Sequence, residues 1–446
     1  MKRIIFLYLT MITTTGLFAQ TLSLEQARVL ALANSRSLAK YELALRSSIL
    51  DERSQLYSML PSVSAEYSAS MNYFYDWEFV NPVDTFRAGA AISITQIIFQ
   101  GGKSFIQKAI SAIATESVRI DALAEYFNVL DSVDNAYYEV LEAAATLEAE
   151  EISLTVATLS HSIAEIRYTS GMITQGDYLR ALADMEVRMN SRNQARRSLA
   201  QSMAKLRTLT GISQAVEFEQ IDFDIYEDVL SRLAGISDEE ADELFGEFRR
   251  IIATSNPSFA KASLNNQRAE KNFSLTQRDY APTIRASIFG AGLNYSAANN
   301  SFSTTSSGGV SITGSIPVDF WVMNNRMERS RIAYESAAID YTNAELSLET
   351  ELQTALLNTF AQAGSVLSFR RSLEYTERHF EFVMERYRLS QSSVSDLHEA
   401  SNLLVNSRNS HIRSKYGFLR SLARLRSLCA LDDEEKLLGL LLGDFL

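Results

Sequence analysis

Three side chains that could bind a metal or exchange protons stand within four positions, at Asp396, His398 and Glu399. In a helix, however, residues two apart point to different sides, so these three side chains do not converge on one ion. The sequence also lacks the G-x-S-x-G, H-E-x-x-H and phosphate-loop motifs. The remaining histidines are scattered with no metal-ligand spacing: His161, His379 and His411. We therefore predict no enzyme, no metal site and no cofactor.

Composition and the N-terminus indicate an exported protein that does not bind nucleic acid. The chain has 42 Lys and Arg against 54 Asp and Glu, a net charge of −12, which disfavours binding to a phosphate backbone. Residues 1–19 combine Lys2-Arg3, an apolar stretch and small residues before Gln20, the pattern of a cleaved signal peptide. The apolar stretch is much shorter than the ~20 residues of a spanning helix. Cys429 is the only cysteine, so no internal disulfide is possible.

The two halves of the sequence resemble each other. The segment 37–43, SLAKYEL, resembles SFAKASL at 258–264, and RYTSGMITQGDYLRA at 167–181 resembles RYRLSQSSVSDLHEA at 386–400. The shared order and near-constant spacing predict two structural repeats, 20–235 and 236–446.

Each repeat is expected to contain a helix, two strands and a long helical hairpin. Caps, turn residues and hydrophobic periodicity set the expected bounds. For the first repeat these are a helix at 23–57, strands at 62–80 and 86–99, a hairpin at 102–211 and a linker at 212–235. For the second they are a helix at 237–280 with a possible break at Asn256-Pro257, strands at 283–298 and 305–319, a hairpin at 324–430 and a tail at 431–446.

The first strand alternates apolar with hydroxyl-rich positions, as in Val63, Ala65 and Tyr67 against Ser62 and Ser64. Such a strand has one apolar and one polar face. The polar face could be solvated over a soluble core, or it could line water while the apolar face meets lipid. A lipid-facing sheet has to close, and closed barrels need at least eight strands, so two or three chains would have to combine. Aromatic residues near the strand ends suit the membrane interface: Tyr73, Tyr75, Trp77, Phe79 and Phe99.

In this order, the segments resemble those of the outer-membrane efflux proteins typified by TolC. The opening at 22–38 resembles that family's first helix, and TQIIFQGGK at 95–103 its strand-to-helix junction, with Ile97 in place of proline. AYYEVLEAAATL at 136–147 resembles its long helix, 167–181 its hairpin tip, and RTLTG at 207–211 the end of its repeat. The resemblance implies a mainly α fold with a small β part. Long helical hairpins would form a periplasmic α-barrel, and four transmembrane strands per chain would trimerise to a twelve-stranded outer-membrane β-barrel.

The same resemblance implies a function. The chain would be the passive exit duct of a tripartite efflux or type I secretion system, located in the bacterial outer membrane and extending into the periplasm. Its partners would be two further copies of itself, a periplasmic adaptor protein, an inner-membrane transporter and outer-membrane lipid. A periplasmic coiled-coil structural protein without a channel is the alternative, but it leaves the strand pairs unexplained.

Matching the hairpin tips to the family assigns expected site residues. The periplasmic aperture would be formed by Asp396, Glu399, Asp177 and Tyr387. The adaptor would contact the tips at Arg167, Tyr168, Gly171, Arg386 and Ser390. Two features depart from the family pattern: serines at 390 and 392 replace the usual glycine and basic residue, and Arg180 lies one turn from Asp177.

Overall fold

The computed structural model of the 446-residue chain describes residues 21–74, 83–212, 217–296, 301–303, 307–389 and 391–443. The predicted signal peptide 1–19, the end of the strand predicted at 62–80, the aromatic residues Tyr75, Trp77 and Phe79, and the tip residue Ser390 lie outside the described residues. Two compact units are present. One comprises the chain up to Leu38, Glu125–Asn256 and the chain from Glu349, and the other comprises Ala39–Ala124 and Pro257–Leu348. Both repeats contribute to both units.

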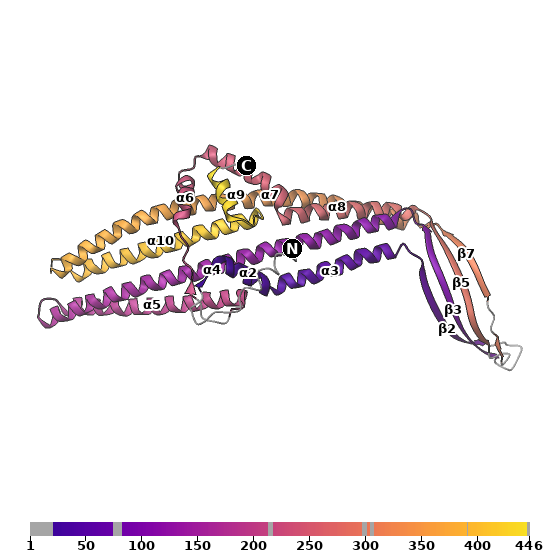
Figure 1. The fold of residues 1–446 in the computed structure, drawn as a ribbon, viewed down its shortest axis with the longest axis horizontal. Helices are drawn as coiled ribbons and strands as arrows, with labels where there is room; N and C mark the ends of the chain where they lie inside the picture. The colour runs from indigo at the N-terminus through magenta and orange to yellow at the C-terminus, as the bar shows by residue number, and fades with distance from the viewer. Residues whose placement is uncertain are drawn as a thin grey trace. The chain divides into compact units, whose positions relative to one another are not determined.

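The second unit contains an antiparallel sheet in the order β2 (Ser62–Phe74), β3 (Val83–Phe99), β5 (Thr283–Ser296), β7 (Ser307–Ser315), with the short β6 (Ser301–Ser303) also on β5 (Figure 1). Directly opposed residues of an antiparallel sheet share a face. One row across the four strands is entirely apolar: Val63, Ile94, Ile288 and Val310. The adjacent row, on the other face, carries only hydroxyls: Ser62, Thr95, Ser287 and Ser311. The alternation seen in the sequence thus becomes an apolar and a polar face.

Four helices follow the order of the strands that they adjoin: α3 (Arg36–Tyr57), α4 (Lys103–Thr169), α8 (Pro257–Gln277) and α9 (Phe320–Arg388). Within this unit, Ser48 of α3 donates a hydrogen bond to Thr115 of α4 at 3.0 Å. Lys261 of α8 pairs with Asp121 of α4 at 2.5 Å. Phe259 of α8 stacks on Tyr341 of α9, with ring centroids 5.2 Å apart. Consequently α3 and α9 are the outer helices, as β2 and β7 are the outer strands.

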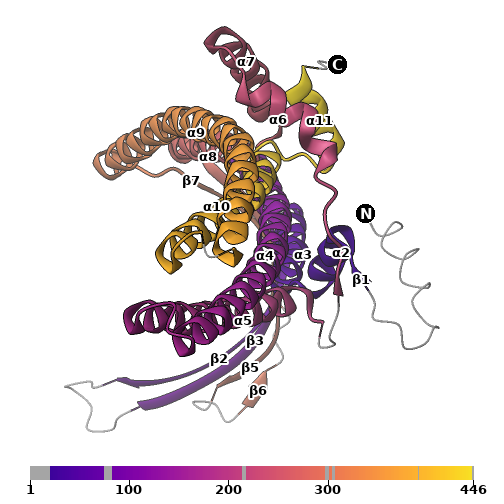
Figure 2. The same cartoon turned by 90° about the vertical axis from the view of Figure 1, so that its left-hand side faces the viewer.

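The first unit contains the turns of the two hairpins and the helical segments next to those turns. Helix α4 turns back into α5 (Gln175–Thr210), and α9 turns back into α10 (Val394–Leu428) (Figures 1 and 2). Shorter elements complete this unit: β1 (Thr21–Leu22) paired in parallel with β4 (Glu217–Phe218), α2 (Leu24–Asn34), η1 (Asp224–Tyr226), α6 (Glu227–Ala234), α7 (Asp238–Ser255) and α11 (Glu434–Leu442). No helix in the described part of the chain is both long and apolar enough to cross a membrane.

A buried charged cluster joins several of these elements. Asp134 of α4 is fully buried, and both its oxygens are bound by Arg28 of α2, at 2.6 and 3.0 Å. Arg426 of α10 also donates to Asp134, and Arg28 lies 3.6 Å from Glu434 of α11. Glu434 in turn accepts a hydrogen bond from Tyr226 of η1 at 2.7 Å.

The first helix expected in each repeat is interrupted in the structure. The helix expected at 23–57 is two helices, α2 and α3, because Ser35 is extended and its hydroxyl accepts from the backbone N–H of Leu38 at 3.3 Å. The helix expected at 237–280 breaks at Asn256, as predicted, because a residue before proline avoids the helical region. It ends in the 3₁₀ turn η2 (Arg278–Tyr280). Ser35 and Asn256 are equivalent positions of the repeats. The expected linker and tail contain the helices α6 and α11.

Candidate functional site at the hairpin tips

The two hairpin tips are built in the same way. In the first tip, the N–H of Met172 donates to the carbonyl of Arg167 at 2.8 Å, and in the second the N–H of Gln391 donates to that of Arg386 at 2.8 Å. Gly171 has a left-handed φ of +73°, which a glycine adopts without steric cost. Each bond satisfies one of the carbonyls that the end of α4 or α9 leaves without a partner inside the helix.

The predicted aperture residues Asp177 and Asp396 occupy equivalent positions and begin the returning helices. Thr174 and Asp177 form a capping box at the start of α5, and Ser393 and Asp396 form one at the start of α10. The backbone N–H of Ser393 donates to Asp396 at 2.9 Å. That bond and the Ser393 hydroxyl lower the pKa of the exposed Asp396 carboxyl below its usual value. Glu399 is also exposed, one turn further along α10.

Tyr387, also predicted at the aperture, is fully buried in this chain. The guanidinium of Arg167 lies over its ring, 4.5 Å from the centroid, and donates to its backbone carbonyl. Burial raises the pKa of the Tyr387 hydroxyl. Arg167 belongs to the first hairpin and Tyr387 to the second, so this contact fastens one tip to the other.

An apolar cluster surrounds that contact. The first hairpin contributes Ala164 and Ala181, and the second contributes Val383, Met384, Val394, Leu397 and Ala400. The two hairpins of one chain therefore pack directly against each other near their ends.

The remaining tip residues lie at the surface. Tyr168 is stacked on Tyr178 with ring centroids 5.2 Å apart, and Gly171 is exposed. Arg386 is exposed and donates to the carbonyl of Gln391 at 3.0 Å. The structure thus brings Arg167 and Tyr387 together. Asp177 takes part in the N-terminal cap of α5, and Asp396 in that of α10.

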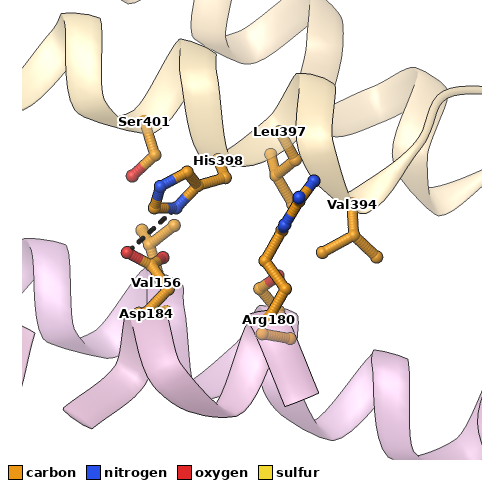
Figure 3. Close-up of a pocket in the computed structure, with 10 residues that line it drawn as sticks. Val156, Arg180, Asp184, Val394, Leu397, His398 and Ser401 are labelled. Atoms are coloured by element: carbon orange, nitrogen blue, oxygen red, sulfur yellow. Dashed lines mark ion pairs between the residues drawn. The ribbon is translucent and has the colours of Figure 1, made fainter. Parts of the chain in front are cut away.

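A polar cluster between α5 and α10 was missed by the sequence analysis (Figure 3). Nδ1 of His398 lies 3.1 Å from Oδ1 of Asp184, and Nε2 of His398 lies 2.9 Å from the amide of Asn402. Arg188 donates to the other end of that amide and lies 3.4 Å from Asp184. The i, i+4 spacings of Asp184 with Arg188 and of His398 with Asn402 were visible in the sequence. The contact between these two pairs was not visible, because α5 and α10 are far apart along the chain.

A cavity lies beside this cluster (Figure 3). Its walls come from α4, α5 and α10, and include Val156, Arg180, Val394, Leu397 and Ser401. No group of three or more His, Cys, Asp or Glu side chains in the described part of the chain is arranged to hold a metal ion.

Comparison with known proteins agrees with this architecture. A family model described as "Outer membrane efflux protein" matches residues 27–212 and 250–430. No curated protein matches the sequence.

Solved structures of outer-membrane channels are similar in fold. The CmeC channel of Campylobacter jejuni has a TM-score of 0.75 at 15% identity, over 93% of this chain and 88% of that one. VceC of Vibrio cholerae has a TM-score of 0.75 at 16% identity, over 92% and 97%. The MtrE channel of Neisseria gonorrhoeae in its open state has a TM-score of 0.70 at 15% identity, over 94% and 93%.

Proposed function

The chain belongs to the outer membrane efflux protein family, and we propose that three copies of it form one passive exit duct. In this proposal the duct works with a periplasmic adaptor and an inner-membrane transporter. Family membership makes the chain an outer-membrane efflux protein that extends into the periplasm. The family resemblance suggests the trimer and the roles of the tip residues, and exposed apolar faces of this chain support the interfaces of that trimer.

The exposed apolar face of the sheet carries the proposal. Val63 is 70% exposed and Ile312 is 76% exposed, although both lie in regular strands where a globular protein would bury them. Large exposed apolar patches mark surfaces that meet lipid or another protein. The hydroxyl row of Ser62, Thr95, Ser287 and Ser311 on the opposite face suits a water-filled lumen.

The edges of the sheet require further copies. Among the described strands, β2 and β7 each have a neighbour on one side only. Unpaired backbone groups in hydrocarbon cost several kcal/mol each, so a lipid-embedded sheet has to close on itself. Four strands are too few for closure, whereas three copies supply twelve. The simplest closure sets β7 of one copy beside β2 of the next.

The outer helices fit the same arrangement. Leu43, Leu50 and Tyr57 are exposed at seven-residue intervals on α3. On α9, Ile332 and Ile339 are exposed with the same spacing. A seven-residue apolar repeat is the pattern of helices that pack side by side.

These apolar residues point away from the contacts within the chain. Leu50 lies two residues, about 200° around the helix, from Ser48, which faces α4. Ile339 lies two residues from Tyr341, which faces α8. If β7 of one copy pairs with β2 of the next copy, α9 of the first copy also lies beside α3 of the next.

Charge placed in this seam tests the trimer. We expect Ile332→Glu/Ile339→Glu to abolish trimers in detergent, because the buried carboxylates would lack partners. Glu345→Lys, a charge change on another side of α9, is the matched control and should leave trimers intact. Light scattering of detergent-purified protein measures the mass. Trimers of the double variant would refute this interface.

At the tips, we infer that Asp396 and Glu399 contribute carboxylates to the periplasmic aperture, with Asp177 nearby in the other hairpin. Three copies of each around an axis would attract cations and repel anions. Tyr387 would act by holding the two hairpins together, since it is buried. The exposed tip residues Tyr168, Gly171 and Arg386, with Arg167 and Ser390, are the proposed contacts for the adaptor.

Ion selectivity separates the charge of Asp396 from its capping role. Asp396→Asn/Glu399→Gln should lower the ratio of cation to anion permeability across lipid bilayers. Ser393→Ala removes the cap but keeps both carboxylates, so it should preserve that ratio. An unchanged ratio in the double variant would exclude these residues from the aperture.

A further inference from the structure

A cation and an aromatic ring interrupt the hydroxyl-rich face of the sheet. On β5, Arg285 lies two residues before Ser287, a member of the hydroxyl row, and Phe289 lies two residues after it. Residues two apart on a strand share a face, so all three side chains belong to the polar face. A charged group and an apolar ring on one wall can together recognise a molecule that carries both characters.

Arg285 has no acidic partner in the described part of the chain. It is exposed, and its side chain forms no ion pair or hydrogen bond with any described residue. Asp279, just before β5, is already paired with Lys103 at 2.7 Å. Glu66 shares the polar face, but it lies two strands away and six residues further along, roughly 20 Å from Arg285. The five guanidinium donors of Arg285 therefore remain available to a ligand.

Hydroxyl groups lie close to Arg285 on the neighbouring strands. Thr313 of β7 is directly opposite Arg285. In the next row of the same face, the hydroxyls of Thr95 and Ser287 lie 3.4 Å apart. Each of these hydroxyls has one donor and two acceptor sites. A guanidinium with hydroxyls beside it suits an oxyanion such as a carboxylate, sulfonate or phosphate group.

Phe289 supplies an apolar surface on the same face. Its side chain is 45% exposed in a row that otherwise consists of Ser64, Ser93 and Gly309. The ring lies over Gly309 of β7, because a Cβ added to that glycine would be 2.7 Å from Cζ of Phe289. An aromatic ring over a glycine also shields the sheet backbone. Shielding alone would explain the ring, but not the unpaired cation on the same strand.

We propose that Arg285 and Phe289 form a binding site for amphiphilic anions on the wall of the duct. The anionic group binds Arg285 and the neighbouring hydroxyls, and the apolar body of the ligand lies on Phe289. At about 3.4 Å per residue, the backbone positions of Arg285 and Phe289 are roughly 13 Å apart, so the site fits an elongated organic anion rather than a simple inorganic one.

This inference rests on the proposed function, in which the polar face lines the lumen of a trimeric duct. Three copies would place three such sites at one level of the lumen. Rings of arginine side chains favour anions in other pores. The inference therefore assigns a chemical class of cargo to the duct.

Block of single channels in planar lipid bilayers tests the site in the purified full-length protein. The probe is biphenylsulfonate, which carries an anionic group at one end of two linked aromatic rings. Methanesulfonate has the anionic group without the rings, and biphenylsulfonamide has the rings without the charge. We expect biphenylsulfonate to reduce the current at concentrations several-fold lower than either control compound.

Variants separate the two parts of the site. Arg285→Gln removes the charge and Phe289→Ser removes the ring, and each should raise the half-blocking concentration of biphenylsulfonate several-fold. Phe289→Tyr keeps the ring and should retain the block. Ser311→Ala, in the hydroxyl row of β7, is the matched control and should also retain it. Arg285 is exposed and unpaired, so Arg285→Gln leaves the fold intact and decides the test even where Phe289→Ser weakens the sheet.

Conductance without the probe shows whether each variant still forms the duct. Wild-type half-blocking concentrations in a conducting Arg285→Gln or Phe289→Ser variant would overturn the inference. A conducting wild-type protein that biphenylsulfonate blocks no better than the two control compounds do would also overturn it, while leaving the duct in place. A wild-type protein that carries no current would instead contradict the proposed function.

Discussion

At the scale of single residues, Gly101 shows how tightly the strand-to-helix junction is packed. Its φ is +62°, and a Cβ added there would lie 2.3 Å from Cβ of Ala281. Gly102 has a φ of +79° but open space around it. Both glycines relieve backbone strain, but only Gly101 also avoids a clash.

Gly101→Ala should therefore destabilise the protein more than Gly102→Ala. The left-handed conformation costs each variant about 1–2 kcal/mol, and Gly101→Ala adds the cost of the overlap. Thermal unfolding of the detergent-purified protein measures the difference. Equal unfolding temperatures for the two variants would contradict the packing described here.

Asp396 gives a prediction for acid conditions. A carboxyl with a lowered pKa contributes stability at neutral pH, and this contribution is lost as the pH falls through that lowered value. We expect the first turn of α10 to lose hydrogen-exchange protection in acid in the wild type. Asp396→Asn should lack this dependence, and Glu399→Gln should retain it. The same acid response in Asp396→Asn would show that another group causes it.

Sequence reasoning reached some of these residues and missed others for physical reasons. The equivalence of Asp177 and Asp396 was visible because a helix cap is a local pattern. The contact of Asp184 with His398 joins helices from different repeats, and no local pattern reports it. The burial of Tyr387 likewise depends on the neighbouring hairpin.

At the scale of elements, the buried carboxylate of Asp134 fixes α2 and α10 against α4. Asp134→Ala would leave Arg28 and Arg426 without this partner in a buried setting, at a cost of about 3–5 kcal/mol. Glu142→Ala removes a partly exposed pair with Arg420 and should cost at most about 1 kcal/mol. Urea unfolding followed by circular dichroism compares the two variants. Similar losses of unfolding free energy in the two variants would mean that the Asp134 cluster stabilises the protein no more than the Glu142–Arg420 pair does.

Elements with strong periodicity or caps were predictable, and those defined by tertiary contacts were not. The long hairpins and strand pairs are close to their expected bounds, because their patterns repeat over many residues. The break at Ser35 lacks a proline and was missed, whereas its counterpart at Asn256 precedes one. Helices α6 and α11 are short, and their burial against other parts of the first unit gives no long periodic signal.

At the scale of the whole molecule, the proposed trimer gives the sheet and the outer helices the same partner. In the proposed trimer, the exposed apolar row from Val63 to Val310 faces lipid, and the outer edges of β2 and β7 in the described sheet pair with neighbouring copies. The seams on α3 and α9 lie on the corresponding outer helices. A trimeric duct accounts for all three features, whereas a coiled-coil protein without a channel would account for the helical seams but leave the sheet unexplained.

The conductance of the purified full-length chain in planar lipid bilayers tests this account most directly. We predict discrete conductance steps from trimeric protein, and their loss in Val63→Asp/Ile312→Asp, which charges the lipid-facing side of the sheet. Ser64→Asp, on the polar face, should still conduct. A wild-type chain that remains a folded monomer in buffer without detergent, and carries no current, would contradict the account.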